Sequence, residues 1–258
     1  MTGTTLARAL NASSLAELSW LDPAGEPHAC GVVALVRGDE PALAFTYAVE
    51  PLARQVASAT ALVLSLREIR STGRGFEPLL VEGIPRLLED PRGDLFVEDL
   101  LEQELRRYPP SRLLADSPLL MREHWWYLPR LVVEIKVDTV RPVPARDDGD
   151  SHLLVVADRG RPEVGVARLR QQDGDVLALD VVGPVPPAGP AVLFGQDASF
   201  PDLDRWSQWH YRGRWDGRAV TVMEAPAHTG LGPVPGLLQR WRRQRALERR
   251  CVEAIRRT

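Results

Sequence analysis

Short apolar runs separated by turn-forming residues recur along most of the chain, and this pattern limits the fold more than any other feature. Residues 14–22 end at the turn Asp22–Gly25, and the next run, 27–36, ends at Gly38-Asp39. Similar runs follow at a spacing of roughly 8–12 residues, which favours a small β-barrel over a parallel sheet with crossover helices. A barrel also leaves no exposed sheet edge.

Three segments have helical spacing instead. Residues 51–58 begin with Pro51, which suits the first turn of a helix. Residues 94–108 place four leucines and one phenylalanine on one helical face. Residues 237–255 carry an apolar stripe on a very basic background, so we expect an amphipathic C-terminal helix that packs on the barrels.

The segment after the first half has the composition of a linker. Residues 142–150 are rich in proline and then in aspartate, with no periodic apolar face. A calcium loop is the alternative, but the segment lacks the ligand spacing and the later glutamate of an EF-hand. We therefore expect a solvated linker at 142–151 between a unit at 1–141 and a second unit at 152–258, which includes the C-terminal helix.

The opening pattern recurs after this linker. Residues 152–169 repeat the order strand, turn, strand of residues 14–35, and Asp173-Gly174 takes the place of Gly38-Asp39. Self-similarity of this kind predicts the duplication of one β-rich unit. The expected fold is mainly β, with two tandem barrel units, a few helices and a C-terminal helix.

Charge and cysteine content narrow the class of protein. The formal net charge is -3, which gives no overall reason to expect nucleic acid or an anionic membrane as a partner. Cys30 and Cys251 are too few for a disulfide framework. No apolar run reaches the roughly 20 residues of a membrane span, and the N-terminus lacks a secretion signal, so we expect a cytoplasmic protein.

Common catalytic motifs are absent from the sequence. There is no Gly-x-Ser-x-Gly, no P-loop and no Gly-x-Gly-x-x-Gly after a strand. The five histidines never occur at metal-binding spacing, so no metal site is expected. Catalytic residues cannot be assigned from the sequence.

The first half resembles a known family in the order of its motifs. A strand leads to an Asp-x-x-Gly-x-Pro-His turn at 22–28, then to Phe45-Thr46-Tyr47, to a short helix with Arg54, and to a strand with Val81-Glu82-Gly83. This order is similar to that of the pyridoxamine 5'-phosphate oxidase-like, FMN-binding split-barrel family. The resemblance covers about residues 14–140, with a weaker echo at 152–226.

The resemblance implies an FMN site in the first half, with a small-molecule substrate. The family's matching stretch contacts the flavin phosphate, which implies cofactor-binding roles for Thr46, Tyr47, Arg54 and Gln55. An arginine beside a hydroxyl and a helix N-terminus suits a phosphate. The alternative is an exposed arginine on an amphipathic helix and a threonine that favours a strand.

The sequence departs from the family at two places. The apolar run 31–35 stands where pyridoxamine-phosphate oxidases have a basic residue, and Leu79 or Leu80 stands where a glutamine often leads the Val-Glu-Gly strand. Both departures put true pyridoxamine-phosphate oxidase activity in doubt.

A second cluster lies late in the chain, at 206–213. Split barrels bind flavin between two barrels, so Trp206, Gln208 and His210 are candidates to flank or hydrogen-bond the ring system. The alternative is a strand whose aromatic side chains fill the core between the barrels. Trp125, Trp126 and Tyr127 present the same choice.

Two functional hypotheses remain open from the sequence. The first is an FMN-dependent oxidoreductase. Deazaflavin is an alternative cofactor, and haem is another, with His124 or His210 as the iron ligand. The second is a non-catalytic binding or interaction module that has lost its cofactor. The duplication predicts a pseudo-dimer within one chain, and a homodimer of such chains is equally compatible.

Overall fold

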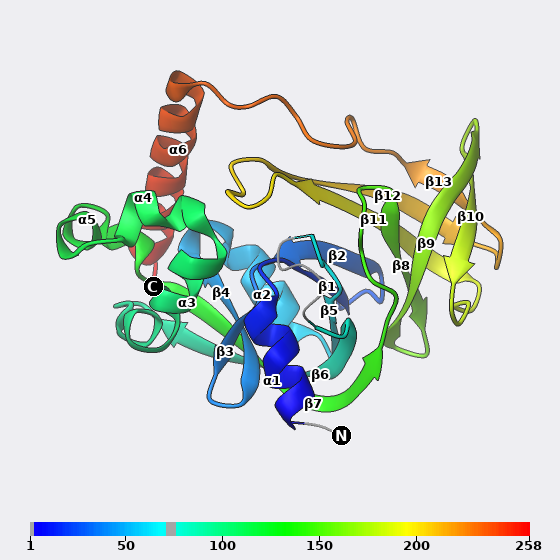
Figure 1. Ribbon diagram of the computed structural model, residues 1–258, viewed down its shortest axis with the longest axis horizontal. Coiled ribbons are helices and arrows are strands. Elements are labelled where there is room, and N and C mark those ends of the chain that lie inside the picture. The colour runs from blue at the N-terminus through cyan, green and yellow to red at the C-terminus, as the bar shows by residue number, and fades with distance from the viewer. Residues whose placement is uncertain (1–2, 71–75) are drawn as a thin grey trace.

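The computed structural model describes residues 3–70 and 76–258, and it is built mainly from two antiparallel β units (Figure 1). The first unit has the strand order β2-β1-β5-β6-β7-β4-β3. Its strands are β1 (Ala16–Leu21), β2 (Pro27–Val32), β3 (Leu35–Arg37), β4 (Glu40–Thr46), β5 (Leu62–Leu66), β6 (Leu79–Asp90) and β7 (Arg130–Pro142). The two edge strands, β2 and β3, are joined by two residues only, so the sheet must curl round until its edges meet.

The second unit is a closed six-stranded barrel with the order β10-β13-β12-β11-β8-β9. Its strands are β8 (Ser151–Asp158), β9 (Arg161–Asp173), β10 (Val176–Val182), β11 (Gly189–Ala198), β12 (Trp206–Trp215) and β13 (Ala219–Glu224). The expected mainly β fold with two β units and a C-terminal helix is confirmed.

The two units share one pairing order. If β2 and β3 count as a single strand, each unit has six strands, and the order in which neighbouring strands pair is the same in the first unit as in the barrel β8 to β13. In both units the first strand pairs with the second and also with the fourth of the six. A common origin by duplication stays a prediction.

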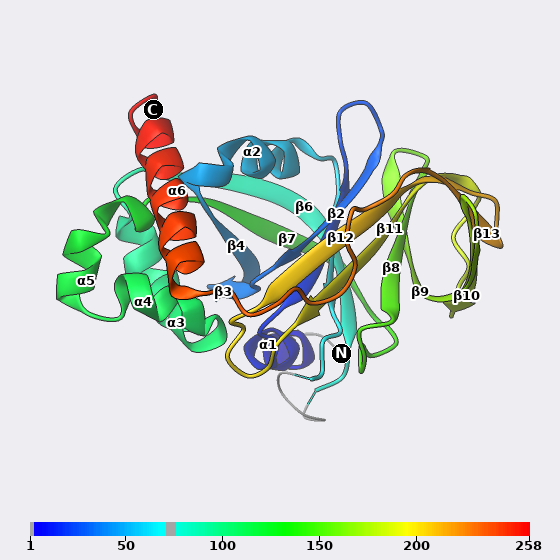
Figure 2. The ribbon, with the colours of Figure 1, turned by 90° about the horizontal axis from the view of Figure 1, so that it is seen from above.

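The helices gather mostly around the first unit. They are α1 (Gly3–Ala12), α2 (Glu50–Ser58), α3 (Leu101–Arg107), α4 (Arg112–Ala115), α5 (Pro118–Glu123) and α6 (Leu237–Ile255), with the short turns η1 (Tyr47–Val49), η2 (Phe96–Leu100), η3 (Pro109–Ser111) and η4 (Trp125–Tyr127). Figure 2 places α3 to α6 at one end of the molecule and the barrel strands β9, β10 and β13 at the other. None of the helices in the described ranges is long and apolar enough to cross a membrane.

Three of the apolar clusters in the core define the two units and the contact between them. One fills the first unit around Trp20, and another fills the barrel around Trp215. A third joins the two units, because Ala29, Val63 and Leu80 of the first pack with Phe194 and its neighbours in the second. The units are therefore held together by a continuous apolar contact.

Several expectations about elements differ from the structure. Helix α1 was not expected, and the helix expected at 94–108 is divided into the π-turn η2 and α3. The expectation that residues 142–151 are solvated throughout is wrong, because Arg146 is fully buried and bonds to Glu17. The expected amphipathic helix is present as α6, and it packs on the first unit through Cys251 and Ala254.

Candidate functional site

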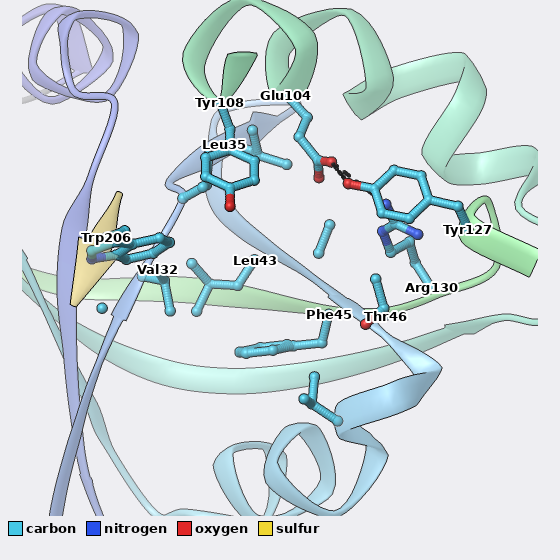
Figure 3. A pocket seen from close by; sticks show the side chains of 14 residues that line it. Val32, Leu35, Leu43, Phe45, Thr46, Glu104, Tyr108, Tyr127, Arg130 and Trp206 are labelled. Carbon is cyan, nitrogen blue, oxygen red and sulfur yellow. Dashed lines mark hydrogen bonds and ion pairs between the residues drawn. The ribbon is translucent and has the colours of Figure 1, made fainter. Parts of the chain in front are cut away.

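A pocket of about 210 Å³ opens beside the first sheet, where the second unit meets it (Figure 3). Strands β2, β3 and β4 form its floor, α3 and η4 form its far wall, and the start of β12 closes one side. Val32, Leu43 and Phe45 make the lining largely apolar, and Trp206 adds an aromatic wall. A concave apolar lining with a few polar groups is typical of small-molecule sites.

Two of the expected site residues meet at this pocket. Thr46 ends β4, and Trp206 begins β12 in the other half of the chain. The Trp206 indole donates from Nε1 to Gln196 Oε1 at 3.0 Å and lies edge-on to Tyr108, with 6.0 Å between the ring centroids. These contacts fix the ring plane.

Three other expected residues follow Thr46 in the chain but do not line the pocket. The Tyr47 side chain is buried in the core of the first unit. Arg54 is half exposed, and it pairs with Glu50 and Glu89 at 2.8 Å each. The hydrogen bonds that Arg54 donates to these carboxylates raise the pKa of Arg54, so its charge is already compensated. Gln55 lies partly exposed on α2.

Gln208 and His210 bind the first unit instead of lining the pocket. The Gly31 N–H donates to Gln208 Oε1 at 2.9 Å, and Gln208 Nε2 donates to the Gly31 carbonyl at 3.3 Å. His210 Nε2 donates to the Ala29 carbonyl at 2.7 Å. Burial lowers the pKa of His210, so a neutral imidazole suits this position. Both side chains therefore act as inter-unit hydrogen-bonding groups.

The pocket also contains two charged residues that the sequence did not indicate, Arg130 and Glu104, together with Tyr127, which was a candidate in the aromatic run 125–127. Arg130 begins β7 and is fully buried, and Glu104 and Tyr127 lie beside it. Tyr127 donates to Glu104 Oε1 at 2.6 Å, and Ser111 donates to the same oxygen at 2.7 Å. These residues come from separate elements and form no local motif. The one sequence signal was a lone arginine at the start of an apolar strand.

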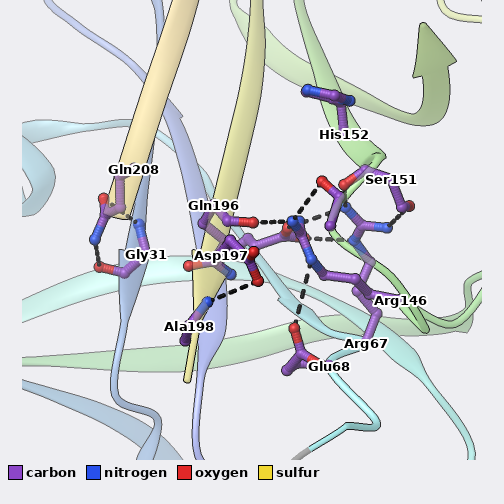
Figure 4. Close-up of polar contacts among 12 residues, drawn as sticks. Gly31, Arg67, Glu68, Arg146, Ser151, His152, Gln196, Asp197, Ala198 and Gln208 are labelled. Carbon is purple, nitrogen blue, oxygen red and sulfur yellow. Dashed lines mark hydrogen bonds and ion pairs between the residues drawn. The ribbon is translucent and has the colours of Figure 1, made fainter. Parts of the chain in front are cut away.

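A second buried polar cluster lies between the units (Figure 4). Arg67 and Arg146 are fully buried and share the carboxylate of Glu17. Arg67 also donates to Ser151 Oγ at 2.7 Å, and Arg146 donates to the Gln196 carbonyl. First-unit and second-unit groups thus meet in one hydrogen-bonded network, which supports the interface.

The histidines do not lie at the pocket. None of them belongs to its lining, and no cluster of three or more metal-ligating side chains occurs in the described ranges. His124 has both ring nitrogens in contact, with the Leu114 carbonyl at 3.1 Å and with Gln244 at 3.1 Å. Neither His124 nor His210 therefore presents a free nitrogen to this pocket.

Comparison with known proteins gives only distant likenesses. No protein-family model and no curated protein matches the chain. Among solved structures, it is similar to a heme-binding protein from Mycobacterium smegmatis, at 13% identity over 100% of this chain and 99% of that chain, with a TM-score of 0.37.

Two further solved structures are similar to parts of the chain. A pyridoxamine 5'-phosphate oxidase-related, FMN-binding protein from Nostoc punctiforme matches at 13% identity over 70% of this chain and 96% of that chain, with a TM-score of 0.33. A protein from Agrobacterium tumefaciens matches at 18% identity over 53% of this chain and 54% of that chain, about half its length, with a TM-score of 0.36. Likenesses at this level assign no ligand and no residue role to the chain.

Proposed function

We propose that this protein binds a small planar organic molecule in the pocket between Phe45 and Trp206. The observation that carries the proposal is the pocket itself, because aromatic rings from both halves of the chain line a largely apolar hollow with a few polar groups. Flat ligands gain dispersion and stacking energy against such walls. The hydroxyl of Tyr108 points into the hollow and supplies a polar contact for orientation.

The residues do not fit a complete FMN. The pocket of about 210 Å³ is smaller than the roughly 300–1,000 Å³ of ordinary ligand sites. Arg54, the expected phosphate ligand, lies outside the lining and is paired with two carboxylates. Gln208 is likewise engaged with Gly31. We therefore favour the binding module over the flavin-dependent oxidoreductase, and a haem in this pocket is disfavoured because no histidine lines it.

The first test is the visible absorption spectrum of the protein purified from cells, followed by titration of the protein with FMN. We expect no flavin or haem bands and no saturable FMN binding. A stoichiometric flavin spectrum would overturn the binding-module proposal and restore the oxidoreductase hypothesis.

The second test measures binding of a smaller planar probe. Lumazine, a bicyclic pteridine-dione, is titrated into the protein while its fluorescence is followed. We expect saturable binding that weakens about 10-fold in Trp206→Leu, because one aromatic wall is lost. Trp125→Leu is the matched control, since Trp125 is an exposed tryptophan outside the pocket. Equal binding by both variants, or no binding at all, would remove the proposal.

A further inference from the structure

The inner end of the pocket carries a charged pair with unused hydrogen-bonding capacity. The Arg130 guanidinium lies between the rings of Phe96 and Tyr127, 3.8 and 4.2 Å from their centroids. Aromatic faces on both sides attract the cation and fix the plane of the group. Arg130 is therefore held rigidly beside the pocket with only its edges available for hydrogen bonds.

One edge of this guanidinium has no hydrogen-bond partner. Within the described part of the chain, nothing accepts from Arg130 Nε or Nη2. Nη2 lies 3.5 Å from Glu104 Oε1, which is longer than a normal hydrogen bond. These two N–H groups form the fork with which arginine binds planar acceptors. Because buried donors are nearly always paired, this unpaired fork points to an acceptor that a ligand supplies.

Glu104 supplies an acceptor beside this fork. Its Oε1 is anchored by the hydroxyls of Tyr127 and Ser111. No residue in the described ranges donates a hydrogen bond to Oε2. Figure 3 shows the carboxylate directed into the pocket, close to the Tyr127 hydroxyl. A ligand at this end therefore meets two donors and one acceptor.

The charges of the pair select a neutral group. The positive charge of Arg130 and the negative charge of Glu104 cancel at close range. An anionic ligand would face Glu104 and a cationic one would face Arg130, and each would add an uncompensated buried charge. A neutral edge with a carbonyl next to an N–H avoids both penalties.

We propose that Arg130 and Glu104 recognise the adjacent C=O and N–H groups of a neutral planar heterocycle, as found in pteridine-diones and pyrimidine-diones. Arg130 donates to the carbonyl and Glu104 accepts from the N–H. The ring system then lies between the apolar floor and Trp206. The inference rests on the proposed binding function and names its ligand class.

The test compares probes on the wild-type protein at a pH where the pteridine-diones are neutral. Lumazine has both ring N–H groups, 1,3-dimethyllumazine has neither, and 6,7-dimethyllumazine keeps both while adding the same two methyl groups elsewhere. We expect 1,3-dimethyllumazine to bind about 10-fold or more weakly than 6,7-dimethyllumazine, as the loss of a hydrogen bond to a charged group requires. Benzoate and benzylamine, which carry opposite charges, should bind more weakly than lumazine.

A variant protein with an altered preference between neutral and anionic probes gives a second test. Glu104→Gln leaves the Arg130 charge uncompensated, so we expect weaker lumazine binding and stronger benzoate binding. Glu102→Gln is the matched control, because Glu102 is exposed on the same helix. If Glu104→Gln does not fold, the wild-type comparison of probes decides the question alone.

The outcomes separate this inference from the proposed function. Equal wild-type affinity for the two dimethyl compounds, or tighter binding of a charged probe than of lumazine, overturns the recognition by Arg130 and Glu104 and leaves the pocket as a binding site. Failure of every planar probe to bind removes the proposed function and this inference with it.

Discussion

Arg54 shows how the partners of a residue decide what its charge can do. On sequence it is the natural phosphate ligand, yet Glu50 and Glu89 hold its guanidinium on the surface of α2. Exposed ion pairs of this kind contribute little, typically about 0.2–1 kcal/mol. Arg54 therefore contributes little to stability, and its guanidinium is not available to a ligand while it is paired with Glu50 and Glu89.

We predict that Arg54→Ala leaves ligand binding unchanged. The affinity for lumazine should stay within about 2-fold, and the free energy of unfolding should fall by no more than about 1 kcal/mol. Fluorescence titration and urea denaturation provide the two measurements. A large loss of binding would mean that Arg54 leaves its two carboxylates when ligand is present.

Tyr127, in contrast to the exposed Arg54, is buried, and its hydroxyl donates to Glu104. Burial raises the pKa of Tyr127 well above its usual value, so the hydroxyl keeps its proton at neutral pH. We predict that Tyr127→Phe lowers the free energy of unfolding by about 1–3 kcal/mol, because Glu104 loses a short hydrogen bond. Urea denaturation measures the loss. Tyr211→Phe, on the half-exposed Tyr211, should change stability by less, and similar losses in both would contradict the special role of Tyr127.

At the scale of elements, the close approach of β2 and β12 depends on Gly31. A Cβ at this position would lie 2.3 Å from Gln196 Oε1 and 2.6 Å from the Trp206 ring. Gln196 is fully buried, and the indole is held by Gln196 and by Tyr108. The apolar run at 31–35, noted as a departure from the family, thus begins at a residue whose lack of a side chain lets the two units meet.

We predict that Gly31→Ala destabilises the protein by about 1–3 kcal/mol, as overpacking does, and also weakens lumazine binding because Trp206 must shift. Gly232→Ala is the control, since a Cβ there meets no atom within 4 Å. Urea denaturation and lumazine titration are run on both variants. Loss of stability without any change in binding would mean that Trp206 does not form the pocket wall in solution.

The elements themselves were largely predictable from the sequence. Alternating apolar runs and turn residues located most strands, because burial of one face imposes a period of two. Helix α1 was missed even though Leu6, Ala9 and Leu10 fall at helical spacing, and the packing of these three side chains in the core of the first unit orders the helix. Local spacing cannot reveal such tertiary packing.

The site was only partly predictable, for a related reason. Thr46 and Trp206 were expected, and the structure brings them to one pocket. Arg130 and Glu104 were not expected, because they come from different elements and meet only after folding. The burial of Arg146 could not be predicted for the same reason. The residue lies in a segment with the composition of a solvated linker, and its partners Glu17 and Gln196 are distant in the sequence.

At the scale of the whole molecule, the two units are joined by an apolar cluster and by the buried network around Glu17. The network contains two fully buried arginines, so its stability depends on the carboxylate between them. Removing one partner of a buried pair is expected to cost about 3–5 kcal/mol, because an uncompensated charge stays behind. Glu68, which is also buried, pairs with Arg146 as well, with 3.4 Å between Glu68 Oε2 and Arg146 Nε. The association of the units is therefore tied to buried carboxylates, among which Glu17 contacts both arginines.

Acid should weaken the contact between the two units, because it protonates Glu17. Burial alone raises the pKa of Glu17, but the charges and hydrogen bonds of Arg67 and Arg146 outweigh burial and lower the pKa below its ordinary value of 4.5. A lowered folded-state pKa contributes stability that is fully present above pH 4.5 and is lost as the pH falls through the folded-state value. We predict that Glu17→Gln is less stable than wild type at pH 7 and that the difference shrinks in acid.

Urea denaturation from pH 7 down to pH 3 measures this convergence, with Glu163→Gln as the control. Glu163 is exposed on β9, so its variant should follow the wild-type curve throughout. If the Glu17→Gln and wild-type curves stay parallel as the pH falls, the acid sensitivity of the protein originates elsewhere. If they converge, the carboxylate of Glu17 is the group whose protonation loosens the contact between the two units.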